Sequence, residues 1–460
     1  KKQMIELQSY LDKQKKFFQT GVTKDISCRI EQLKKLKQIL VDNEQLLIEE
    51  VHKDFQKSAF ETYVTEIGLV TTDINYAIKN VESWSKQQSV STPLVNFPSK
   101  NFIITEPYGS ALIIAPWNYP ILLALQPLVG AIAAGNTAIL KPSELTPNTS
   151  SLLEKLISEN FDEEFLKVIL GGVEESSALV KMDFDYIFFT GSTRVGKIIM
   201  RDAAERLTPL TLELGGKSPC IIDKTANLEV SAKRVAWGKF VNAGQTCVAP
   251  DYLLVEHSVK AEFLDHVKTA INQLYGDDPK ESPDFPRIIN DAHFDRLAAL
   301  LSDGETVIGG ESDKHTRYIA PTILNNVTLD DPIMQDEIFG PILPVLEYES
   351  VEDCIQIINA RPRPLALYVF TSDQALEDHI LSTISFGGGA VNDTIAQLGN
   401  HHLSFGGVGA SGFGSYHGKS SFDCFSHKKS VMKKPFWPDF PIRYAPYDDI
   451  KLGLVKKVLK

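Results

Sequence analysis

Short apolar runs rich in β-branched and aromatic residues alternate with helix-type segments through the middle of the chain. The strand-like runs are Ser110–Ala115, Thr137–Leu140, Lys167–Leu170, Tyr186–Thr190, Leu210–Leu214 and Cys220–Ile222. The helix-type segments between them are Ile121–Ala134, Thr149–Asn160, Ser176–Lys181 and Val195–Arg206. Strands that are joined through helices need crossover connections, and these produce a parallel sheet with helices on both faces. The alternation therefore predicts an α/β fold with a doubly wound parallel sheet.

The segments on either side extend this pattern. Residues 1–90 carry apolar residues at helical spacing, which predicts long amphipathic helices. A second α/β stretch runs from residue 226 to 392. The glycine-rich segment Ser385–Tyr416 has little periodicity and predicts a long structured loop.

One uncharged run begins at Pro107 and ends before Lys141. A transmembrane helix needs about 20 apolar residues without strong breaks. Prolines and polar residues such as Pro116, Asn118 and Pro120 interrupt the run. We therefore predict a buried strand, a loop and a core helix here, and no transmembrane segment.

The chain of 460 residues has 47 Lys and Arg against 59 Asp and Glu, a net charge of −12. Nucleic-acid binding needs clustered cations, so this balance argues against a nucleic-acid partner. The five cysteines are an odd number without a C-x-x-C pair, which fits a reducing compartment. The polar segment Lys1–Asp12 lacks the apolar core of a signal peptide. We expect a cytoplasmic protein of about three domains.

Two motif-like segments are set aside. Gly191–Ile198 is one residue short of a phosphate-binding P-loop, because Ile198 cannot supply the hydroxyl that holds magnesium. His401 and His402 have no further ligands at metal-binding spacing, so no metal site is predicted.

Three residues are candidates for chemistry. Cys247 lies between Gly244 and Pro250, which suggests a fixed loop that presents its thiol, although a lone cysteine is usually a small buried apolar residue. Glu213 is an acid in an apolar strand, where burial would raise its pKa toward that of a general base. The alternative is a carboxylate that reaches water at the end of the strand. Asn118 is either a turn asparagine or an oxyanion donor.

Two further segments suit a dinucleotide. Tyr186–Gly196 reads as a strand, a glycine turn and a helix start, where unpaired N–H groups attract an anion such as pyrophosphate. Lys141 and Glu144 follow another strand, at an edge of the sheet where ligands collect, and they suit ribose hydroxyls. Each segment taken alone also fits an ordinary turn or helix cap.

Together these segments resemble the NAD(P)-dependent aldehyde dehydrogenases over essentially the whole chain. The matching motifs, in the order of the family, are Pro116-Trp-Asn118, Lys141-Pro-Ser-Glu144, Phe189-Thr-Gly-Ser192 with Gly196, Glu213-Leu-Gly-Gly216, Gly244-Gln-Thr-Cys247 and Glu337-Ile-Phe339-Gly-Pro341. The segments that follow Cys247 and Phe405 resemble the class 3 branch, whose members oxidise medium- and long-chain aliphatic or aromatic aldehydes and are typically homodimers.

The resemblance implies a fold with three parts. A Rossmann-like NAD(P)-binding domain would span 1–211, with an excursion at 86–106 into a small bridging element. An α/β catalytic domain would span 212–392, and 393–460 would supply the bridging or oligomerisation segment and a C-terminal tail.

The resemblance also implies roles for single residues. The Cys247 thiolate would attack the aldehyde, Asn118 would hold the oxyanion, and Glu213 would activate the water that hydrolyses the thioester. Cofactor contacts would come from Lys141, Glu144, Gly191, Ser192, Gly196, Glu337 and Phe339. Glu144 would repel a 2′-phosphate, which argues for NAD, although the branch often accepts NADP as well.

The substrate stays open at this point. Trp117 and Tyr119 flank Asn118 and suggest an aromatic wall for fatty, aromatic or carotenoid aldehydes. The alternatives are a CoA-acylating semialdehyde dehydrogenase and a non-catalytic structural protein on the same fold. The tail 447–460 is too short and too charged to span a membrane, and it predicts an amphipathic helix that packs on the protein or touches a lipid surface. We expect this tail to border the substrate entrance.

Overall fold

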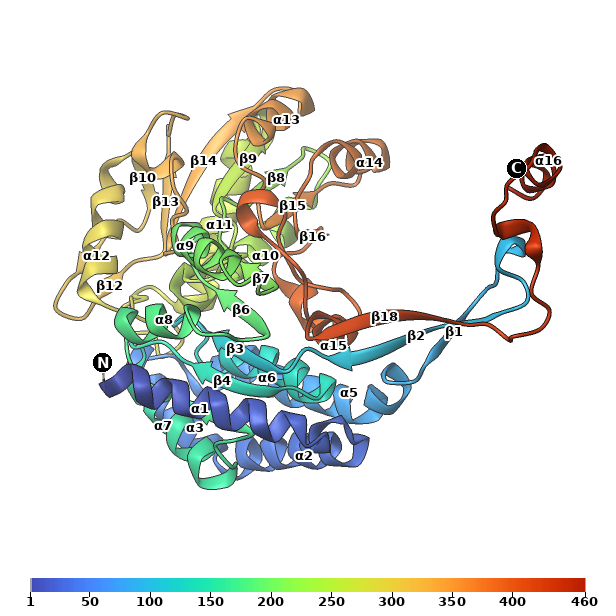
Figure 1. Ribbon diagram of the computed structural model, residues 1–460. Helices are drawn as coiled ribbons and strands as arrows, with labels where there is room; N and C mark the ends of the chain where they lie inside the picture. The colour runs from blue at the N-terminus through green and yellow to red at the C-terminus, as the bar shows by residue number, and fades with distance from the viewer. Residues whose placement is uncertain (1, 460) are drawn as a thin grey trace.

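The computed structural model describes residues 2–459, and its first sheet is the predicted doubly wound one (Figure 1). The strand order is β17-β7-β6-β3-β4-β5, and all neighbours are parallel except β17, which runs antiparallel to β7. The strands are β3 (Ser110–Ile114), β4 (Thr137–Lys141), β5 (Leu166–Val168), β6 (Tyr186–Thr190), β7 (Leu210–Glu213) and β17 (Gly412–Phe413).

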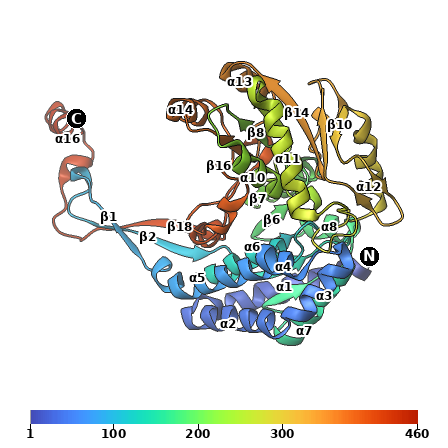
Figure 2. The ribbon, with the colours of Figure 1, turned by 180° about the vertical axis from the view of Figure 1, so that it is seen from behind.

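Helices cover both faces of this sheet because successive strand residues point to opposite sides. Leu112 and Ile114 pack with α1, α8 and α9, whereas Ala111 and Ile113 pack with α2, α5, α6 and α7. Figure 2 shows α2, α5 and α7 together in the lower layer. The helices are α1 (Lys2–Gln19), α2 (Ile26–Asp42), α3 (Glu44–Phe55), α4 (Ala59–Thr62), α5 (Gly68–Trp84), α6 (Leu122–Ala134), α7 (Pro147–Asn160), α8 (Val173–Val180), α9 (Thr193–Ala204) and α15 (Lys419–Cys424). The long helices that we predict for residues 1–90 are confirmed.

A second sheet follows, with the order β10-β13-β14-β9-β8-β15-β16. Its strands are β8 (Pro219–Ile222), β9 (Tyr252–Glu256), β10 (Glu305–Ile308), β13 (Thr322–Asn325), β14 (Ile342–Tyr348), β15 (Ala366–Phe370) and β16 (Gly388–Val391), beside a small pair β11 (Ser312–Asp313) and β12 (Tyr318–Ile319). Its helices are α10 (Leu228–Phe240), α11 (Lys260–Tyr275), α12 (Asp291–Ala298), α13 (Val351–Asn359) and α14 (Gln374–Thr383).

One expectation changes at the junction of these sheets. The predicted strand Cys220–Ile222 exists, but it belongs to the second sheet, in which β8 pairs with β9 and β15. β7 ends at Glu213 and pairs with β6 in the first sheet. The chain therefore passes from one sheet to the other between β7 and β8.

The glycine-rich segment Ser385–Tyr416 is not only a loop. It contains β16, paired with β15, and β17, paired with β7. Sequence patterning misses these strands because their glycines give no apolar alternation. The segment therefore contributes an edge strand to each of the two sheets.

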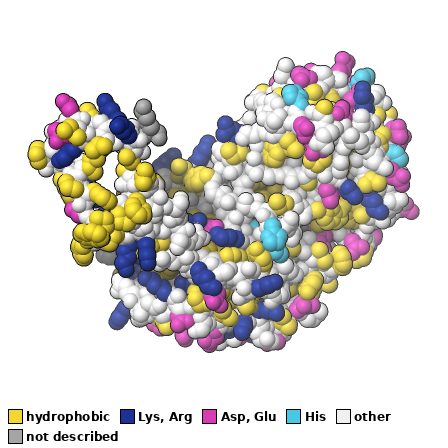
Figure 3. Space-filling view, turned by 90° about the vertical axis from the view of Figure 1, so that its right-hand side faces the viewer, with side chains coloured by type: hydrophobic (Ala, Val, Ile, Leu, Met, Phe, Trp, Pro, Cys, Tyr) yellow, Lys and Arg dark blue, Asp and Glu magenta, His cyan; other side chains and the backbone are white. Residues whose placement is uncertain are grey.

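An antiparallel arm extends from the body and is formed by β1 (Gln88–Val90), β2 (Lys100–Pro107) and β18 (Ser426–Lys433) (Figure 1). Its strands come from the excursion at 86–106 and from the last part of the chain. At its far end, α16 (Asp449–Val458) forms the predicted tail helix and lines a groove with residues such as Phe97 and Phe440. Figure 3 shows hydrophobic side chains gathered on this arm.

Between residues 2 and 459, no helix is both long enough and apolar enough to cross a membrane.

Gly130 provides a test of the packing between α6 and α15. A Cβ at this position would lie 2.8 Å from both Cβ and the carbonyl oxygen of Ser421. We expect Gly130→Ala to lower the free energy of unfolding by about 1–3 kcal/mol, because the clash outweighs the gain in helix propensity. Urea unfolding measures this change in the free energy of unfolding. Gly453→Ala is the control, because Gly453 lies in α16 with open space around it. Equal stability of the two variants would contradict the packing argument.

Candidate active site

Cys247 follows a tight turn between α10 and β9. Asn242 and Ala243 have positive φ angles of 54° and 51°. Gly244 has a φ of 75°, and a Cβ there would meet the carbonyl oxygen of Gly340 at 2.2 Å. The loop before the thiol is thus fixed, as we infer from its sequence. Burial raises the pKa of the Cys247 thiol, and the nearby carboxylates Glu337 and Glu213 raise it further.

Cys247 lines two cavities of about 230 and 260 Å³. The smaller cavity is mainly apolar, and its wall includes Leu69, Tyr119, Trp237 and Phe405. The larger cavity is richer in polar groups, and its wall includes Asn118, Thr190, Gly191, Ser192, Glu213, Glu337, Phe339 and Trp117. The thiol therefore stands at the junction of an apolar and a polar space.

Asn118 lies in the connection from β3 to α6 and is buried. Its side-chain Nδ2 donates a hydrogen bond to the carbonyl of Gln245, 3.1 Å away. Nδ2 of Asn242 donates in turn to the carbonyl of Asn118 at 2.7 Å. These bonds tie Asn118 to the turn that carries Cys247. The two residues, 129 positions apart in sequence, share the polar cavity.

Glu213 ends β7 and is 1% exposed. Neither of its carboxylate oxygens has a hydrogen-bond partner among the described residues. Burial raises the pKa of this carboxyl well above its ordinary value. The alternative that Glu213 reaches water at the end of its strand is therefore wrong. Its carboxyl is an unpaired buried group that lines the same cavity as Cys247.

Glu337 and Phe339 close the polar cavity from the segment before β14. Burial raises the pKa of Glu337 to about 8. Phe339 has a positive φ of 55°, and its ring packs edge-on against Trp117 with ring centres 5.3 Å apart. The strained backbone at Phe339 holds an aromatic surface beside a carboxyl group.

Gly191, Ser192 and Gly196 lie where β6 turns into α9. Ser192 is the N-cap of α9, and its hydroxyl accepts from the N–H of Val195 at 3.4 Å. A Cβ on Gly196 would lie 2.6 Å from a methyl group of Leu214, so helix and strand pack closely here. The start of α9 therefore faces the cavity through Gly191 and Ser192.

Lys141 and Glu144 lie at the end of β4. Nζ of Lys141 is 3.2 Å from Oε2 of Glu144. The Glu144 side chain is 44% exposed, and neither residue lines the cavity at Cys247. These two residues form a separate polar position along the same edge of the sheet. Any ligand that contacts both them and Glu337 must be extended.

The aromatic wall expected from Trp117 and Tyr119 is divided. Tyr119 lines the apolar cavity, whereas Trp117 lines the polar one, beside His293 and Phe339. The buried turn around Asn118 directs the two side chains to opposite sides.

Sequence reasoning missed most of the apolar wall. Leu69, Trp237, Phe405, Tyr416 and His417 contribute to it, from α5, α10 and the segment before β18. Burial lowers the pKa of the His417 imidazole to about 3, so this ring is neutral in the wall. Only the fold brings these elements together.

The tail does not border this cavity within one chain. No residue of 447–459 is among the described residues that line it, because α16 lies at the end of the arm. Among residues 2–459 there is also no group of three or more His, Cys, Asp or Glu side chains placed to hold a metal ion.

Comparison with known proteins gives a consistent result. The profile of the "Aldehyde dehydrogenase family" matches residues 6–431. A 4,4'-diaponeurosporen-aldehyde dehydrogenase of Staphylococcus aureus is 51% identical over 435 residues, which cover 94% of this chain and 95% of the relative. Aldehyde dehydrogenase family 3 member B3 of Mus musculus is 46% identical, with 97% and 94% covered.

Solved structures agree with the sequence matches. The substrate-bound state of Staphylococcus aureus AldH superposes with a TM-score of 0.96 at 49% identity, covering 98% of this chain and 99% of that one. An indole-3-acetaldehyde dehydrogenase in complex with NAD+ has a TM-score of 0.86 at 27% identity, with 94% and 89% covered.

The buried carboxyl of Glu213 predicts a gain in stability when its charge is removed. Its pKa in the folded state is raised above the ordinary 4.5, so the folded protein binds this proton more tightly than the unfolded chain. The folded state therefore loses stability as the pH rises above 4.5. We expect Glu213→Gln to raise the free energy of unfolding at pH 7 by at least about 1.4 kcal/mol, the equivalent of one pKa unit. Urea unfolding at pH 4.5 and 7 measures the gain.

The gain should shrink toward pH 4.5, where the folded state holds the proton and the unfolded chain is already half protonated. The exposed Glu205 is the control, and Glu205→Gln should change little at either pH. A Glu213→Gln protein that is less stable at pH 7 would show that other interactions offset the free-energy cost of burying the Glu213 carboxylate.

Proposed function

Because this chain belongs to the aldehyde dehydrogenase family, with class 3 members among its relatives, we propose that it oxidises a long apolar aldehyde to the carboxylic acid at Cys247. The observation that carries this proposal is the position of the thiol. It lies where an apolar cavity meets a polar cavity that contains Asn118, Glu213 and Glu337. Oxidation of aldehydes with NAD(P) is the activity of the family, and the roles of single residues are our assignments.

The first step is addition of the Cys247 sulfur to the aldehyde carbonyl. The thiolate is the nucleophile, so the proton must leave the sulfur before or during attack. Burial holds the pKa of this thiol high, and Glu337 and Glu213 are the nearby bases that can receive the proton. The amide of Asn118 and the N–H of Cys247 hold the oxyanion of the thiohemiacetal.

Hydrolysis follows in the same polar cavity. Bound NAD+ would supply the hydride acceptor, and loss of the hydride from the thiohemiacetal would leave a thioester on Cys247. Glu213 has no partner in its buried site, and its raised pKa suits a general base for the attacking water. Each turnover consumes one aldehyde, one water and one NAD+, and it releases the acid, NADH and a proton.

The residues present fit a dinucleotide. The Thr190 hydroxyl is buried in the cavity wall without a partner among the described residues, which leaves a polar group for a ligand. Glu337 and Phe339 would hold the nicotinamide end. Gly191, Ser192 and Gly196, at the start of α9, would line the dinucleotide. Lys141 and Glu144 would hold the adenosine ribose. Glu144 favours NAD over NADP, because its carboxylate would repel a 2′-phosphate.

The apolar cavity supports a substrate with a long hydrocarbon part. Its wall is formed by aliphatic and aromatic side chains, which favour burial of apolar surface. The Staphylococcus relative is named for a carotenoid aldehyde, and we include a carotenoid aldehyde beside fatty and aromatic aldehydes in the proposed substrate class.

We also propose a homodimer that works in the cytoplasm. The five cysteines are free, which suits a reducing compartment. The arm exposes large apolar side chains, including Phe436 and Trp437, of the kind that subunit contacts bury. Peripheral contact of α16 with a lipid surface is an alternative use of the same side chains.

Two other functions remain on the same fold. A CoA-acylating dehydrogenase would release the thioester to coenzyme A, but the unpaired buried carboxyl of Glu213 favours hydrolysis by water. A non-catalytic protein would not need Asn118, Glu213 and Cys247 to share one cavity.

The proposed reaction predicts that NADH forms with long-chain and aromatic aldehydes and not with Cys247→Ala. Absorbance at the NADH band over an aldehyde panel, with NAD+ and NADP+ in parallel, measures this. We expect at least a 10³-fold loss of rate in the variant, because no covalent intermediate can form.

Product analysis separates the alternatives. Release of the free acid would support hydrolysis by water. An acyl-CoA that forms when coenzyme A is added would instead show that the protein is a CoA-acylating dehydrogenase. No turnover of any aldehyde with either cofactor would favour the non-catalytic use of the fold.

The apolar cavity predicts chain-length selectivity. We expect Leu69→Asp to raise the KM for a C10–C12 aldehyde about 10- to 100-fold, because a buried leucine contact is worth about 1.5–3 kcal/mol. Propanal should be oxidised within twofold of the original rate, since a three-carbon chain buries little apolar surface in the cavity. Steady-state kinetics with both aldehydes measure the difference. Leu207→Asp, at an exposed position outside the cavity, is the control. A uniform loss with both aldehydes would reject the cavity as the site for the hydrocarbon chain.

A further inference from the structure

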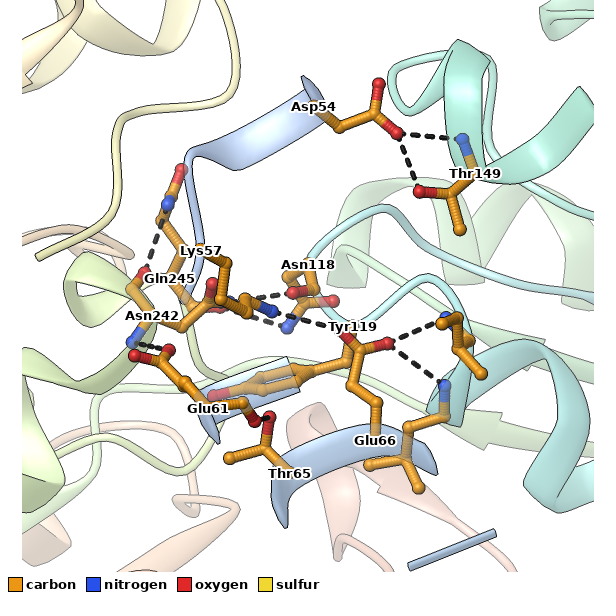
Figure 4. Close-up of polar contacts among 12 residues, drawn as sticks. Asp54, Lys57, Glu61, Thr65, Glu66, Asn118, Tyr119, Thr149, Asn242 and Gln245 are labelled. Carbon is orange, nitrogen blue, oxygen red and sulfur yellow. Dashed lines mark hydrogen bonds and ion pairs between the residues drawn. The ribbon is translucent and has the colours of Figure 1, made fainter. Parts of the chain in front are cut away.

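Three charged side chains from the N-terminal helices lie behind the candidate site. Lys57, Glu61 and Glu66 belong to the stretch from the end of α3 to the π-helical turn Tyr63–Ile67 (Figure 4). Lys57 and Glu66 have no exposed side-chain surface, and Glu61 is partly buried. Buried charges are unfavourable unless each one has partners, so their contacts indicate what they hold.

Glu66 joins Lys57 to the start of α6. One carboxylate oxygen lies 3.0 Å from Nζ of Lys57. The other accepts from the N–H groups of Ile121 and Leu122 at 2.7 and 3.2 Å. A carboxylate in this position satisfies unpaired N–H groups and interacts favourably with the helix dipole. Because Asn118 lies three residues before Ile121, Glu66 fixes the backbone that carries it.

Lys57 reaches the same segment from the side. Its ammonium lies 4.5 Å from the centre of the Tyr119 ring. The Tyr119 hydroxyl is 2.6 Å from the hydroxyl of Thr246, the residue before Cys247. Lys57 therefore restrains a ring that joins the oxyanion segment to the nucleophile segment.

Glu61 holds the nucleophile turn directly. Its carboxylate accepts from the N–H of Asn242 at 2.7 Å. Asn242 has a positive φ, and its side chain donates to the carbonyls of Asn118 and Gln245. Without Glu61, the N–H of Asn242 would lose its acceptor in a turn that is already strained.

We propose that Lys57, Glu61 and Glu66 are positioning residues, which hold Asn118 and the Asn242–Cys247 turn in register for oxyanion stabilisation. The stretch of about ten residues from Lys57 to Glu66 thus contacts both the connection after β3, in the first sheet, and the turn before β9, in the second. The inference rests on the proposed function, because the relative position of Asn118 and the turn matters for an oxyanion only if Cys247 attacks an aldehyde. Reacting groups must keep their geometry to within about 0.5 Å, which is the precision that such supporting contacts provide.

The test is a mutant cycle between Glu61 and Asn118. We expect Glu61→Ala to lower kcat at least tenfold with KM for the aldehyde within twofold. Burial raises the pKa of Glu61 to about 7, so Glu61→Gln, which keeps an acceptor oxygen, should retain kcat within threefold. In an Asn118→Ala background, Glu61→Ala should lower kcat less than twofold further, because the register between the turn and residue 118 no longer affects the oxyanion once the Asn118 amide is gone.

Asp54 provides a matched control for helix capping. Its carboxylate is also buried, and it accepts from the N–H and hydroxyl of Thr149 at the start of α7 (Figure 4). Neither Asp54 nor Thr149 is among the residues that line the two cavities at Cys247. Glu66→Gln and Asp54→Asn should both lower the melting temperature, but only Glu66→Gln should lower kcat. Equal kcat values in these two variants, or full additivity of Glu61→Ala with Asn118→Ala, would overturn the proposal.

A second readout does not depend on the proposed reaction. Alkylation of Cys247 by iodoacetamide, followed by mass spectrometry, needs neither aldehyde nor cofactor. We expect Glu61→Ala to accelerate it at least threefold, since the turn loosens, and Glu61→Gln to leave it unchanged. If Asn118→Ala keeps full kcat, the oxyanion assignment fails. An unchanged alkylation rate in Glu61→Ala would then overturn the positioning role itself.

Discussion

The reciprocal hydrogen bonds of Asn118 with Gln245 and Asn242 are the contact on which the site depends. They join the connection after β3, in the first sheet, to the turn before β9, in the second. Each sheet contributes only part of the chemistry: the first brings Asn118 and Glu213, and the second brings Cys247 and Glu337. The polar cavity exists because these two strand–helix connections meet with matched donors and acceptors, and the N-terminal helices reinforce that meeting from outside.

The same site is rich in groups that oppose folding. Glu213 is buried with no partner among the described residues, and burial raises the pKa of both Glu213 and Glu337. Strained backbone at Asn242, Ala243 and Phe339 adds to this. Elsewhere in the described chain, buried charges such as Lys57 and Glu66 are paired. A buried carboxyl without a partner among the described residues, beside a second carboxyl of raised pKa, is what a reactive centre needs and what a purely structural core avoids.

Sequence reasoning predicts the architecture and the residues of the candidate site for physical reasons. Tyr186–Thr190 is one apolar run between clear breaks, and the structure contains that strand with those bounds. Cys247 and Glu213 stood out because a thiol in a rigid loop and an acid in an apolar strand are locally anomalous. Lys57 and Glu66 give no such signal, because single charged residues are ordinary throughout the helix-rich stretch 1–90. The glycine-rich β16 and the opposite orientations of Trp117 and Tyr119 depend on long-range packing, which local patterns do not encode.

The placement of Cys247 between two cavities also bears on the order of events. An aldehyde in the apolar space and a dinucleotide in the polar space would approach the sulfur from opposite sides. Neither would block the route of the other, so the reduced coenzyme could depart while the acyl group is still attached. Water could then occupy the vacated volume beside Glu213. A long acyl chain would remain anchored throughout, and its length would be limited by the apolar cavity rather than by the coenzyme.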